Sequence, residues 1–202
     1  MRIERIEPSD KGRALVFLED GACLRVTERE LLGLGPGDQL DQAALSRLRE
    51  AAGVSEAKLK AADLVGKRAM SRYELEKKLR EKGASEAEAR YAAEWLEAIG
   101  AINDAEYAAA LVRHYGGKGY GPARVREKLY EKGIPKELWE DALAELPEEG
   151  EQIDAFLRLK LRGRTPDERE KRRLTAALQR RGFRWDEVKA AWGRLDVEIG
   201  ED

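Results

Sequence analysis

The chain has 202 residues, of which 39% are charged, 42% are hydrophobic and only 6% are aromatic, and its formal net charge is -2. This apolar content is too high for a disordered chain, and the near-neutral charge excludes a polycation that coats nucleic acid without discrimination. The single cysteine excludes an intramolecular disulfide framework, and no signal peptide or membrane span is evident. We therefore expect a cytoplasmic protein with no metal, cofactor or membrane contact.

Residues 1–54 are expected to form a small β/α element. Two runs of β-branched and aromatic residues flank Asp20-Gly21 within "RALVFLEDGACLRV", a pattern typical of a tight hairpin turn. The preceding "RIERIE" can add a third antiparallel strand, so a hairpin or short meander is predicted, with one face covered by helix. Thr27 and Glu30 predict a capping box for a short helix, and "DQAALSRLREAAG" predicts another. The boundary is placed near Gly53–Ser55, where the class of structure changes.

From residue 57 onward the chain reads as amphipathic helices, and one helix ending recurs three times. The stretches "KLREKGAS", "KLYEKGIP" and "ALQRRGFR" align on Gly83, Gly133 and Gly182, at intervals of about 50 residues. A basic residue before each glycine is typical of a helix that ends in a left-handed residue. Apolar residues stand eight and four positions before each glycine: Leu75 and Leu79, Val125 and Leu129, Leu174 and Leu178. They are predicted to face the core.

Each interval has room for three short helices, which predicts three tandem three-helix repeats at 55–103, 104–149 and 150–202. The first helix of each repeat is expected near 57–70, 105–117 and 151–163. The third helices are expected to bury Ala89, Ala93, Leu96, Trp139, Leu143, Leu146, Val188, Trp192 and Leu195. Helix starts are predicted from the capping pairs Ser71 and Glu74, Ser85 and Glu88, and Thr165 and Glu168. The fold class is therefore mainly α after the small antiparallel β element.

Three stretches, "RAMSRYELEKKLREKGAS", "LEAIGAINDAEYAAALV" and "KGYGPARVREKLYEKGIP", resemble the RecX family of bacterial regulatory proteins. The matching positions are Arg68, Ser71, Glu74, Leu75, Leu79, Gly83, Asn103, Asp104, Tyr107, Ala108, Gly121, Arg124, Leu129, Lys132 and Gly133. The resemblance covers residues 57–146 and extends more loosely to the third repeat. Ala84 stands where a bulky apolar residue is common in the family, which predicts different packing at that turn.

The resemblance implies a regulator with no catalysis of its own. Its expected partner is the RecA recombinase filament on single-stranded DNA, where it would inhibit strand exchange, ATP hydrolysis and filament growth. It would thus be a negative regulator of homologous recombination and of the SOS response. The implied fold is an elongated, curved helical array that lies along the filament groove. A monomer without cofactor is expected, and double-stranded DNA is a second candidate partner.

Basic residues concentrate in "RLKLRGRTPDEREKRRLTAALQRRGFR", which holds 11 basic and 3 acidic side chains. Phosphate contacts are predicted here for Lys171, Arg172, Arg173, Arg180 and Arg181, with Arg158, Arg162 and Arg164 extending the patch. In the middle repeat, Lys118, Arg124, Arg126 and Lys128 form a second candidate surface. The alternative for these positions is a solvated helix face, on which the arginines of the first patch pair with Glu168 and Glu170.

The aromatic residues divide into two groups. Trp95, Trp139, Trp185 and Trp192 mostly fall on apolar helix faces and are expected in the core. Tyr115 and Tyr120 flank the loop "GGKG", which is interpreted as a flexible linker, and they are the better candidates for exposed contacts. His114 and Cys23 have no evident partner for a nucleophile or a metal site.

Two other functions compete with the RecA regulator. Three-helix units with glycine turns also suit a helix-turn-helix module that binds DNA, sequence-specifically or generally, without RecA. A purely structural adaptor of the solenoid type would bind protein only. Charge reversal at Arg172, Arg173 and Arg180 separates the last possibility from the others, because it would leave an adaptor active.

Overall fold

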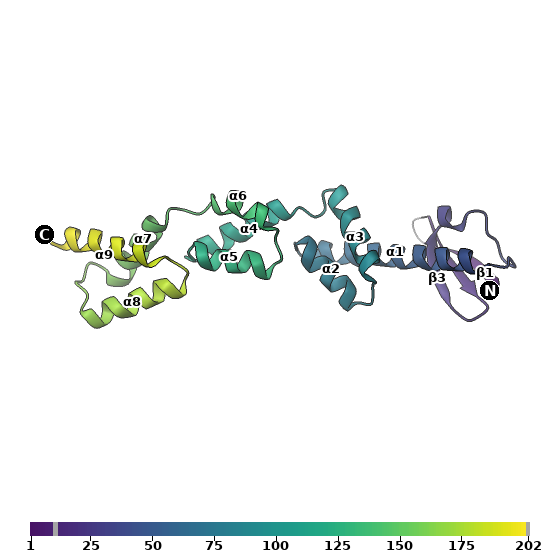
Figure 1. Cartoon of the computed structure of the whole chain (residues 1–202), viewed down its shortest axis with the longest axis horizontal. Helices are drawn as coiled ribbons and strands as arrows, with labels where there is room; N and C mark the ends of the chain where they lie inside the picture. Colours follow the sequence, from purple (N-terminus) through teal and green to yellow (C-terminus); the bar gives the residue numbers. More distant parts are fainter. Residues whose placement is uncertain (10–11, 201–202) are drawn as a thin grey trace. The chain divides into compact units, whose positions relative to one another are not determined.

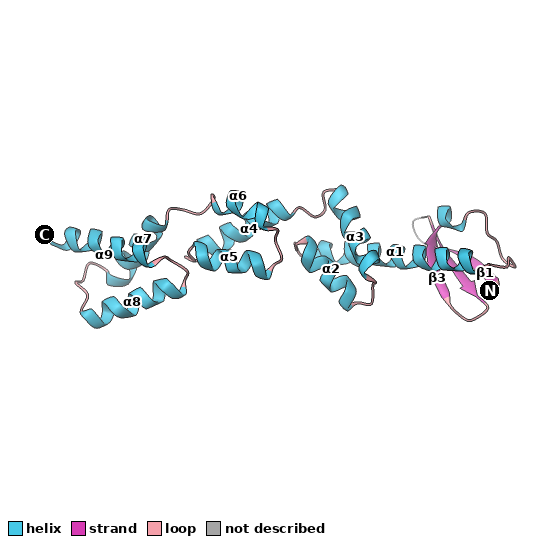
Figure 2. Ribbon diagram, viewed as in Figure 1, coloured by secondary structure: helices cyan, strands magenta, loops and turns pink. Residues whose placement is uncertain are grey.

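The computed structural model describes residues 1–9 and 12–200, with side chains described as far as Leu195. It divides into two compact units, Met1–Ile102 and Asn103–Asp202, which are considered separately below (Figure 1). Figure 2 shows that the strands belong to the amino-terminal part of the first unit and that helices dominate the remainder. The predicted class, mainly α with a small antiparallel sheet at the start, is confirmed. The overall curvature of the array stays a prediction.

The sheet is the expected three-stranded meander of β1 (Ile3–Ser9), β2 (Arg13–Leu18) and β3 (Cys23–Thr27), in the order β1-β2-β3. Both pairings are antiparallel, and Gly21 takes a φ of 82° in the turn between β2 and β3. A 3-10 helix, η1 (Glu28–Leu31), follows β3 with the predicted capping box of Thr27 and Glu30. The apolar face of the sheet is covered by the helix that comes next.

Helix α1 runs without interruption from Gln42 to Lys67, and this corrects the expected break near Gly53–Ser55. Its first half packs Leu48 against the sheet, and its second half packs Ala57 and Ala61 into the next core. Gly53 does not break the helix, and the atom nearest to a Cβ placed there is a carboxylate oxygen at the flexible end of Glu88. One helix therefore belongs to both parts of the first unit.

The first helical repeat is completed by α2 (Arg72–Glu81) and α3 (Glu86–Ala98), which share a core with the second half of α1. Ser71 caps α2 by accepting the Glu74 N–H, and Ser85 forms the predicted capping box with Glu88. Ala84 packs at the edge of this core. Four-way division of the chain at 1–54, 55–103, 104–149 and 150–202 stays a prediction.

The second unit begins with a second repeat of α4 (Asp104–Gly117), α5 (Pro122–Glu131), η2 (Lys136–Leu138) and the short α6 (Trp139–Leu143). Its core includes Val112, Val125 and Leu129, with Trp139 packed at the edge. The third repeat comprises α7 (Glu149–Leu161), α8 (Glu168–Arg180) and α9 (Trp185–Gly200), with a separate core.

The residue that caps α8 is not the predicted one. Asp167, rather than Thr165, is the N-cap, and its carboxylate accepts the Glu170 N–H at 2.6 Å. Pro166 is buried one position before the cap. Both candidate caps have preferred side chains, but a carboxylate next to the first turn also interacts favourably with the positive end of the helix dipole.

The three aligned glycines form the same turn, as predicted. Gly83, Gly133 and Gly182 have φ values of 91°, 64° and 88°. At the third turn the Gly182 N–H donates to the Gln179 carbonyl at 2.9 Å and the Phe183 N–H donates to Leu178 at 3.3 Å. At the first turn the N–H groups of Gly83 and Ala84 donate to the carbonyls of Arg80 and Leu79. At the second turn the N–H groups of Gly133 and Ile134 donate to the carbonyls of Tyr130 and Leu129. This pair of bonds is the Schellman motif. The six apolar residues predicted to precede the turns are all buried.

Candidate functional site

Helix α8 carries a row of arginines on the face opposite its core residues. Arg169, Arg172, Arg173 and Arg180 are exposed, and they stand at spacings of three, four and eleven residues, which place them on one helix face. We call these four residues the α8 stripe. Leu174 and Leu178 are buried on the other side. The stripe extends over about 16 Å of helix axis at 1.5 Å per residue.

Most of the stripe is free of acidic partners. Arg173 pairs with Glu170 at 3.1 Å, and Arg164, in the loop before α8, pairs with the same carboxylate at 3.8 Å. Within the described ranges, Arg169, Arg172 and Arg180 form no ion pair. The alternative of an internally neutralised helix face therefore applies to Arg173 and Arg164, and three cations stay available for an external anion.

Two other residues of the predicted patch flank α8. Arg158 is exposed near the end of α7, and Arg162 is the exposed residue that caps this helix, with a left-handed φ of 51°. The chain then passes through Gly163 and Arg164 into α8. Arg164 is therefore held beside the first turn of α8 through Glu170.

Lys171 and Arg181 lie on the inner side of α8 and contribute to packing. The Lys171 Nζ lies 5.8 Å from the ring centroid of Trp192. The Arg181 guanidinium lies 4.8 Å from the ring centroid of Phe156, and its Nη1 donates to the Gly119 carbonyl at 3.3 Å. Both residues are half-buried. Their positions differ from those of the α8 stripe, which we therefore restrict to the four exposed arginines.

The second and third repeats meet at a joint made of backbone atoms. The Gly121 N–H donates to the Arg181 carbonyl at 2.8 Å, and the Ala123 N–H donates to the Gly182 carbonyl at 3.2 Å. A Cβ on Gly182 would lie 2.4 Å from the Arg124 nitrogen, so only glycine fits this contact without a shift. The carbonyl end of α8 thus meets the amide end of α5, an arrangement that pairs opposite helix dipoles.

This joint corrects the interpretation of "GGKG" as a flexible linker. Gly116 and Gly117 are the last residues of α4, and Gly119 accepts the bond from Arg181. A Cβ on Gly116 would lie 2.7 Å from a Leu146 methyl carbon. Gly116 and Gly119 both lie close to side chains of other helices or turns, so a composition typical of linkers here forms an ordered turn.

The second candidate surface, that of the middle repeat, has fewer unpaired cations for an external anion than the α8 stripe in the described chain. Arg124 pairs with Glu127, and Lys128 pairs with Glu131 at 2.7 Å. The bond to Glu127 raises the pKa of Arg124, and the bond from Lys128 lowers the pKa of Glu131. Lys118 is exposed, with its Nζ 5.8 Å from the ring centroid of Tyr115.

Arg126 is exposed on α5 and forms no ion pair with the described residues. The joint brings this surface, through Lys118 and Arg124, next to the last turn of α8, although more than 50 residues separate them in sequence.

The aromatic predictions hold in part. Trp95, Trp139 and Trp192 pack at the edges of the three cores, whereas Trp185 is 58% exposed. Tyr115 and Tyr120 are half-buried against the second core with ring centroids 5.9 Å apart, so they are not the free aromatic contacts that we expected.

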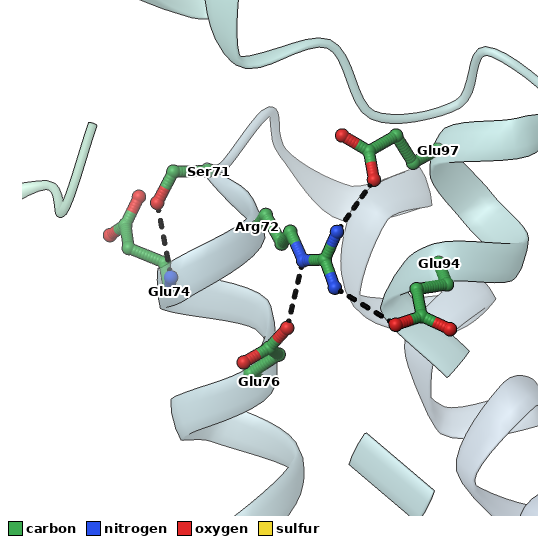
Figure 3. Close-up of polar contacts among 6 residues, drawn as sticks. All are labelled: Ser71, Arg72, Glu74, Glu76, Glu94 and Glu97. Atoms are coloured by element: carbon green, nitrogen blue, oxygen red, sulfur yellow. Dashed lines mark hydrogen bonds and ion pairs between the residues drawn. The ribbon is translucent and has the colours of Figure 1, made fainter. Parts of the chain in front are cut away.

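The first repeat uses its main arginine differently. Arg72 donates to Glu76 at 2.9 Å, to Glu97 at 2.8 Å and to Glu94 at 3.3 Å, as Figure 3 shows. The bonds to Glu94 and Glu97 join α2 to α3, and the bond to Glu76, within α2, is the main cause that raises the pKa of Arg72. Beside it, Glu74 pairs with Arg68 at 3.3 Å. The guanidinium is saturated by carboxylates, so it has a structural role.

One stripe residue was missed by sequence reasoning. Arg169 was left out of the predicted patch, although it precedes Arg172 and Arg173 by three and four residues and therefore shares their face. Sequence spacing could have found it. The inward positions of Lys171 and Arg181 follow from the same spacing, since both lie close to the positions of Leu174 and Leu178 on the helix.

Repeated glycine turns and a separate core in each repeat define a helical-repeat protein, and one of its repeats carries an arginine stripe. In the part of the chain that the structure describes, no His, Cys, Asp and Glu side chains cluster in a way that suits a metal ion. Helices with the length and apolarity needed to cross a membrane are likewise absent from that part.

Comparison with known proteins gives the family. The family model described as RecX, second three-helix domain, matches residues 103–143. The regulatory protein RecX of a Pseudomonas putida strain is 35% identical over 137 residues, covering 67% of this chain and 85% of that protein. The RecX of Pseudomonas fluorescens is 32% identical over 140 residues, covering 68% and 90%. This chain belongs to the RecX family, whose members are regulatory proteins rather than enzymes.

Solved structures agree with this assignment. A crystal structure of regulatory protein RecX matches with a TM-score of 0.74 at 25% identity, covering 95% of this chain and 98% of that chain. The crystal structure of RecX from Lactobacillus salivarius matches with a TM-score of 0.64, also at 25% identity, covering 72% and 97%. The resemblance seen in the sequence is therefore confirmed, and the match to the first structure extends over the amino-terminal sheet as well.

Proposed function

We propose that this protein binds the RecA recombinase filament on single-stranded DNA and inhibits its strand exchange, ATP hydrolysis and growth. It would thereby act in the cytoplasm, as a monomer, to restrain homologous recombination and the SOS response. RecA is the partner that the family name suggests. The DNA contact is supported by one observation above others, the three arginines of the α8 stripe that lack acidic partners in the described chain.

Arginine on an exposed helix face suits phosphate recognition. Its guanidinium keeps its charge at every physiological pH, and it donates several hydrogen bonds in a fixed plane that matches phosphate oxygens. Arg172 and Arg180 are exposed, and no acidic neighbour in the described chain neutralises them. Arg162 is exposed in the turn that leads into α8 and would add a further cation for phosphate contact.

The joint between the second and third repeats holds this basic surface in a fixed arrangement. Because backbone hydrogen bonds connect α5 to the end of α8, the α8 stripe and Arg126 are carried by one ordered pair of repeats. A ligand shifts an equilibrium only through different affinities for its states. Inhibition would follow if this pair binds a non-growing or inactive state of the filament more tightly than the active one.

ATP turnover by RecA tests the proposal. RecA is saturated with single-stranded DNA, and the protein is added at ratios well below one per RecA. A filament inhibitor should lower turnover at these ratios, because each bound molecule affects more than one RecA protomer. Inhibition that appears only when the protein is stoichiometric with DNA, and that naked DNA relieves, would contradict the proposal and favour the RecA-independent DNA-binding module.

Circular duplex DNA supplies the second arm. A module that binds DNA without RecA should bind this duplex, or a single strand, as tightly in the absence of RecA as in its presence. A filament regulator should localise strongly only when RecA coats the single strand, and its residual affinity for naked DNA should fall steeply with salt.

A further inference from the structure

The amino-terminal part of the first unit contains an open groove between η1, the loop after it and the first half of α1. Its volume is about 410 Å³, and we call it the N-terminal groove. It is lined by Arg29, Glu30, Leu32, Leu34, Ala44, Arg47, Leu48 and Ala51. The lining is mostly aliphatic, and the regulatory proposal above makes no use of it.

Leu32 gives the groove an unusual apolar edge. Its side chain is 78% exposed, and its backbone lies in the left-handed region with a φ of 50°. A bulky residue rarely adopts this conformation, and an outlier of this kind is a reason to look for function. Here the backbone holds a leucine side chain in solvent beside the half-buried Leu34.

The groove has an unneutralised basic rim. Arg29 and Arg47 are exposed, and neither has an acidic partner among the described residues. Arg49, only two positions further along α1, pairs with Asp20 at 3.0 Å. The carboxylate of Glu30 is engaged by the Thr27 N–H at 2.7 Å in the capping box. Two arginines and one carboxylate leave the lining of the groove with a net positive charge.

We propose that the N-terminal groove binds an amphipathic acidic segment of a partner protein. Apolar side chains of the segment would cover Leu32, Leu34 and Leu48, while its carboxylates would pair with Arg29 and Arg47. This is the helix-in-groove mode of peptide recognition, with orientation set by charge. The amino-terminal sheet and η1 then have a function of their own, which is to shape this binding surface.

Nucleic acid fits the groove less well. Arg29 and Arg47 could attract phosphates, but unpaired bases bind proteins chiefly by stacking on aromatic rings. None of the residues that line the groove is aromatic. An aliphatic floor next to two cations is complementary to leucine and glutamate side chains instead.

The test uses the full-length protein and three fluorescent probes. The first is a synthetic amphipathic helix with leucines on one face and glutamates on the other. The second is the same peptide with lysine in place of each glutamate, and the third is oligothymidine. Fluorescence anisotropy should show saturable binding of the acidic peptide and much weaker binding of the lysine peptide.

Variants locate the site. Arg29→Glu together with Arg47→Glu should weaken binding of the acidic peptide about tenfold, because two ion pairs become repulsions. Leu32→Asn should weaken it several-fold without backbone strain, since asparagine tolerates the left-handed region. The matched control reverses Arg25 and Lys77, two exposed cations outside the groove, and should leave the affinity unchanged. Arg25 lies on the opposite face of β3 from Val26, which packs in the core.

Four results would overturn the proposal. These are no binding of the acidic peptide, equal binding of the lysine peptide, the same loss in the control as in the groove variant, or thymidine binding that depends on Arg29 and Arg47. The last result would identify the rim as a phosphate site. None of them bears on RecA inhibition, so this proposal and the proposed function fail independently.

Discussion

The first and third glycine turns have the same backbone and the same buried leucines, but three positions that hold arginines of the α8 stripe in the third turn hold no cation in the first. Two, nine and ten positions before Gly182 stand Arg180, Arg173 and Arg172. Before Gly83 the same positions hold Glu81, Glu74 and Tyr73. In the first repeat the nearby Arg72 is bound by three glutamates, whereas in the third repeat three arginines of the α8 stripe are unpaired in the described chain.

The difference teaches which positions the fold constrains. A buried leucine and a left-handed glycine are required in each copy, because the helix must pack and then reverse. Exposed positions on the same helix are free to diverge. The first repeat uses its freedom to tie α2 to α3, and the third uses it to display charge. Duplicated structure therefore gives no reason to expect duplicated function.

The largest effect should come from the shared core, where the two turns ought to respond alike. Leu79→Ala and Leu178→Ala each remove a side chain that is 0% exposed, and each should lower the free energy of unfolding by about 2–5 kcal/mol. Leu129→Ala in the second repeat should fall in the same range. Urea denaturation measures all three. A loss within experimental error at any of them would mean that this position is not part of a packed core.

Substitution of the turn glycines should destabilise the protein more at the third turn than at the first. Gly83→Ala places a side chain in open space at positive φ, so it should cost about 1–2 kcal/mol through backbone strain alone. Gly182→Ala meets the backbone of Arg124 at 2.4 Å and should cost a further ~1–3 kcal/mol. The comparison isolates the joint between the second and third repeats. Equal losses at the two glycines in thermal or urea unfolding would show that the joint contributes nothing to stability.

Charge reversal should separate the two turns in DNA binding. Arg172→Glu, Arg173→Glu and Arg180→Glu combined should weaken binding to oligothymidine and reduce the slope of log K against log salt by about 2, since each phosphate contact on a single strand contributes about 0.7. The matched control is Lys77→Glu, Arg80→Glu and Lys82→Glu, three exposed cations around the first turn. It applies the same change in charge. An unchanged slope in the first variant, or the same change in both, would remove the α8 stripe as the DNA contact.

The smallest effect concerns Glu131, which stands two positions before Gly133 where the third repeat has Arg180. The hydrogen bond from Lys128 lowers the pKa of Glu131 in the folded protein below its usual 4.5. Its contribution to stability is therefore complete above that value and is lost as the pH falls through the lowered pKa. Glu131→Gln should be slightly less stable than the wild type at neutral pH, and the difference should disappear as the pH falls through the lowered pKa. A difference that persists in acid would exclude the ion pair as its cause.

Local signals in the sequence were enough for the repeated turns and the sheet. The spacing of Leu174, Leu178 and Gly182 predicts both a buried helix face and the end of that helix. The pair Asp20-Gly21 predicts a hairpin turn. These features depend on neighbours within a few residues, where propensity and geometry agree. The shared face of the α8 stripe also follows from spacing, once Arg169 is included, whereas the structure is needed to show which of its arginines lack acidic partners.

Features that depend on distant contacts were not predictable. Gly53 has the composition of a boundary, yet α1 continues through it, because its first half packs on the sheet and its second half packs in the next core. The loop "GGKG" reads as a linker until Arg181 and Leu146 are placed against it. The N-terminal groove likewise combines η1 with α1, and its edge at Leu32 requires a left-handed leucine that no sequence rule favours.

The α8 stripe is the surface that we propose carries regulation to RecA on single-stranded DNA. The direct test measures ATP turnover by RecA with substoichiometric wild-type protein, the Arg172, Arg173 and Arg180 reversal, and the Lys77, Arg80 and Lys82 control, at several salt concentrations. We expect inhibition by the wild type and the control, and its loss in the stripe variant. Full inhibition by the stripe variant at every salt concentration would contradict the account.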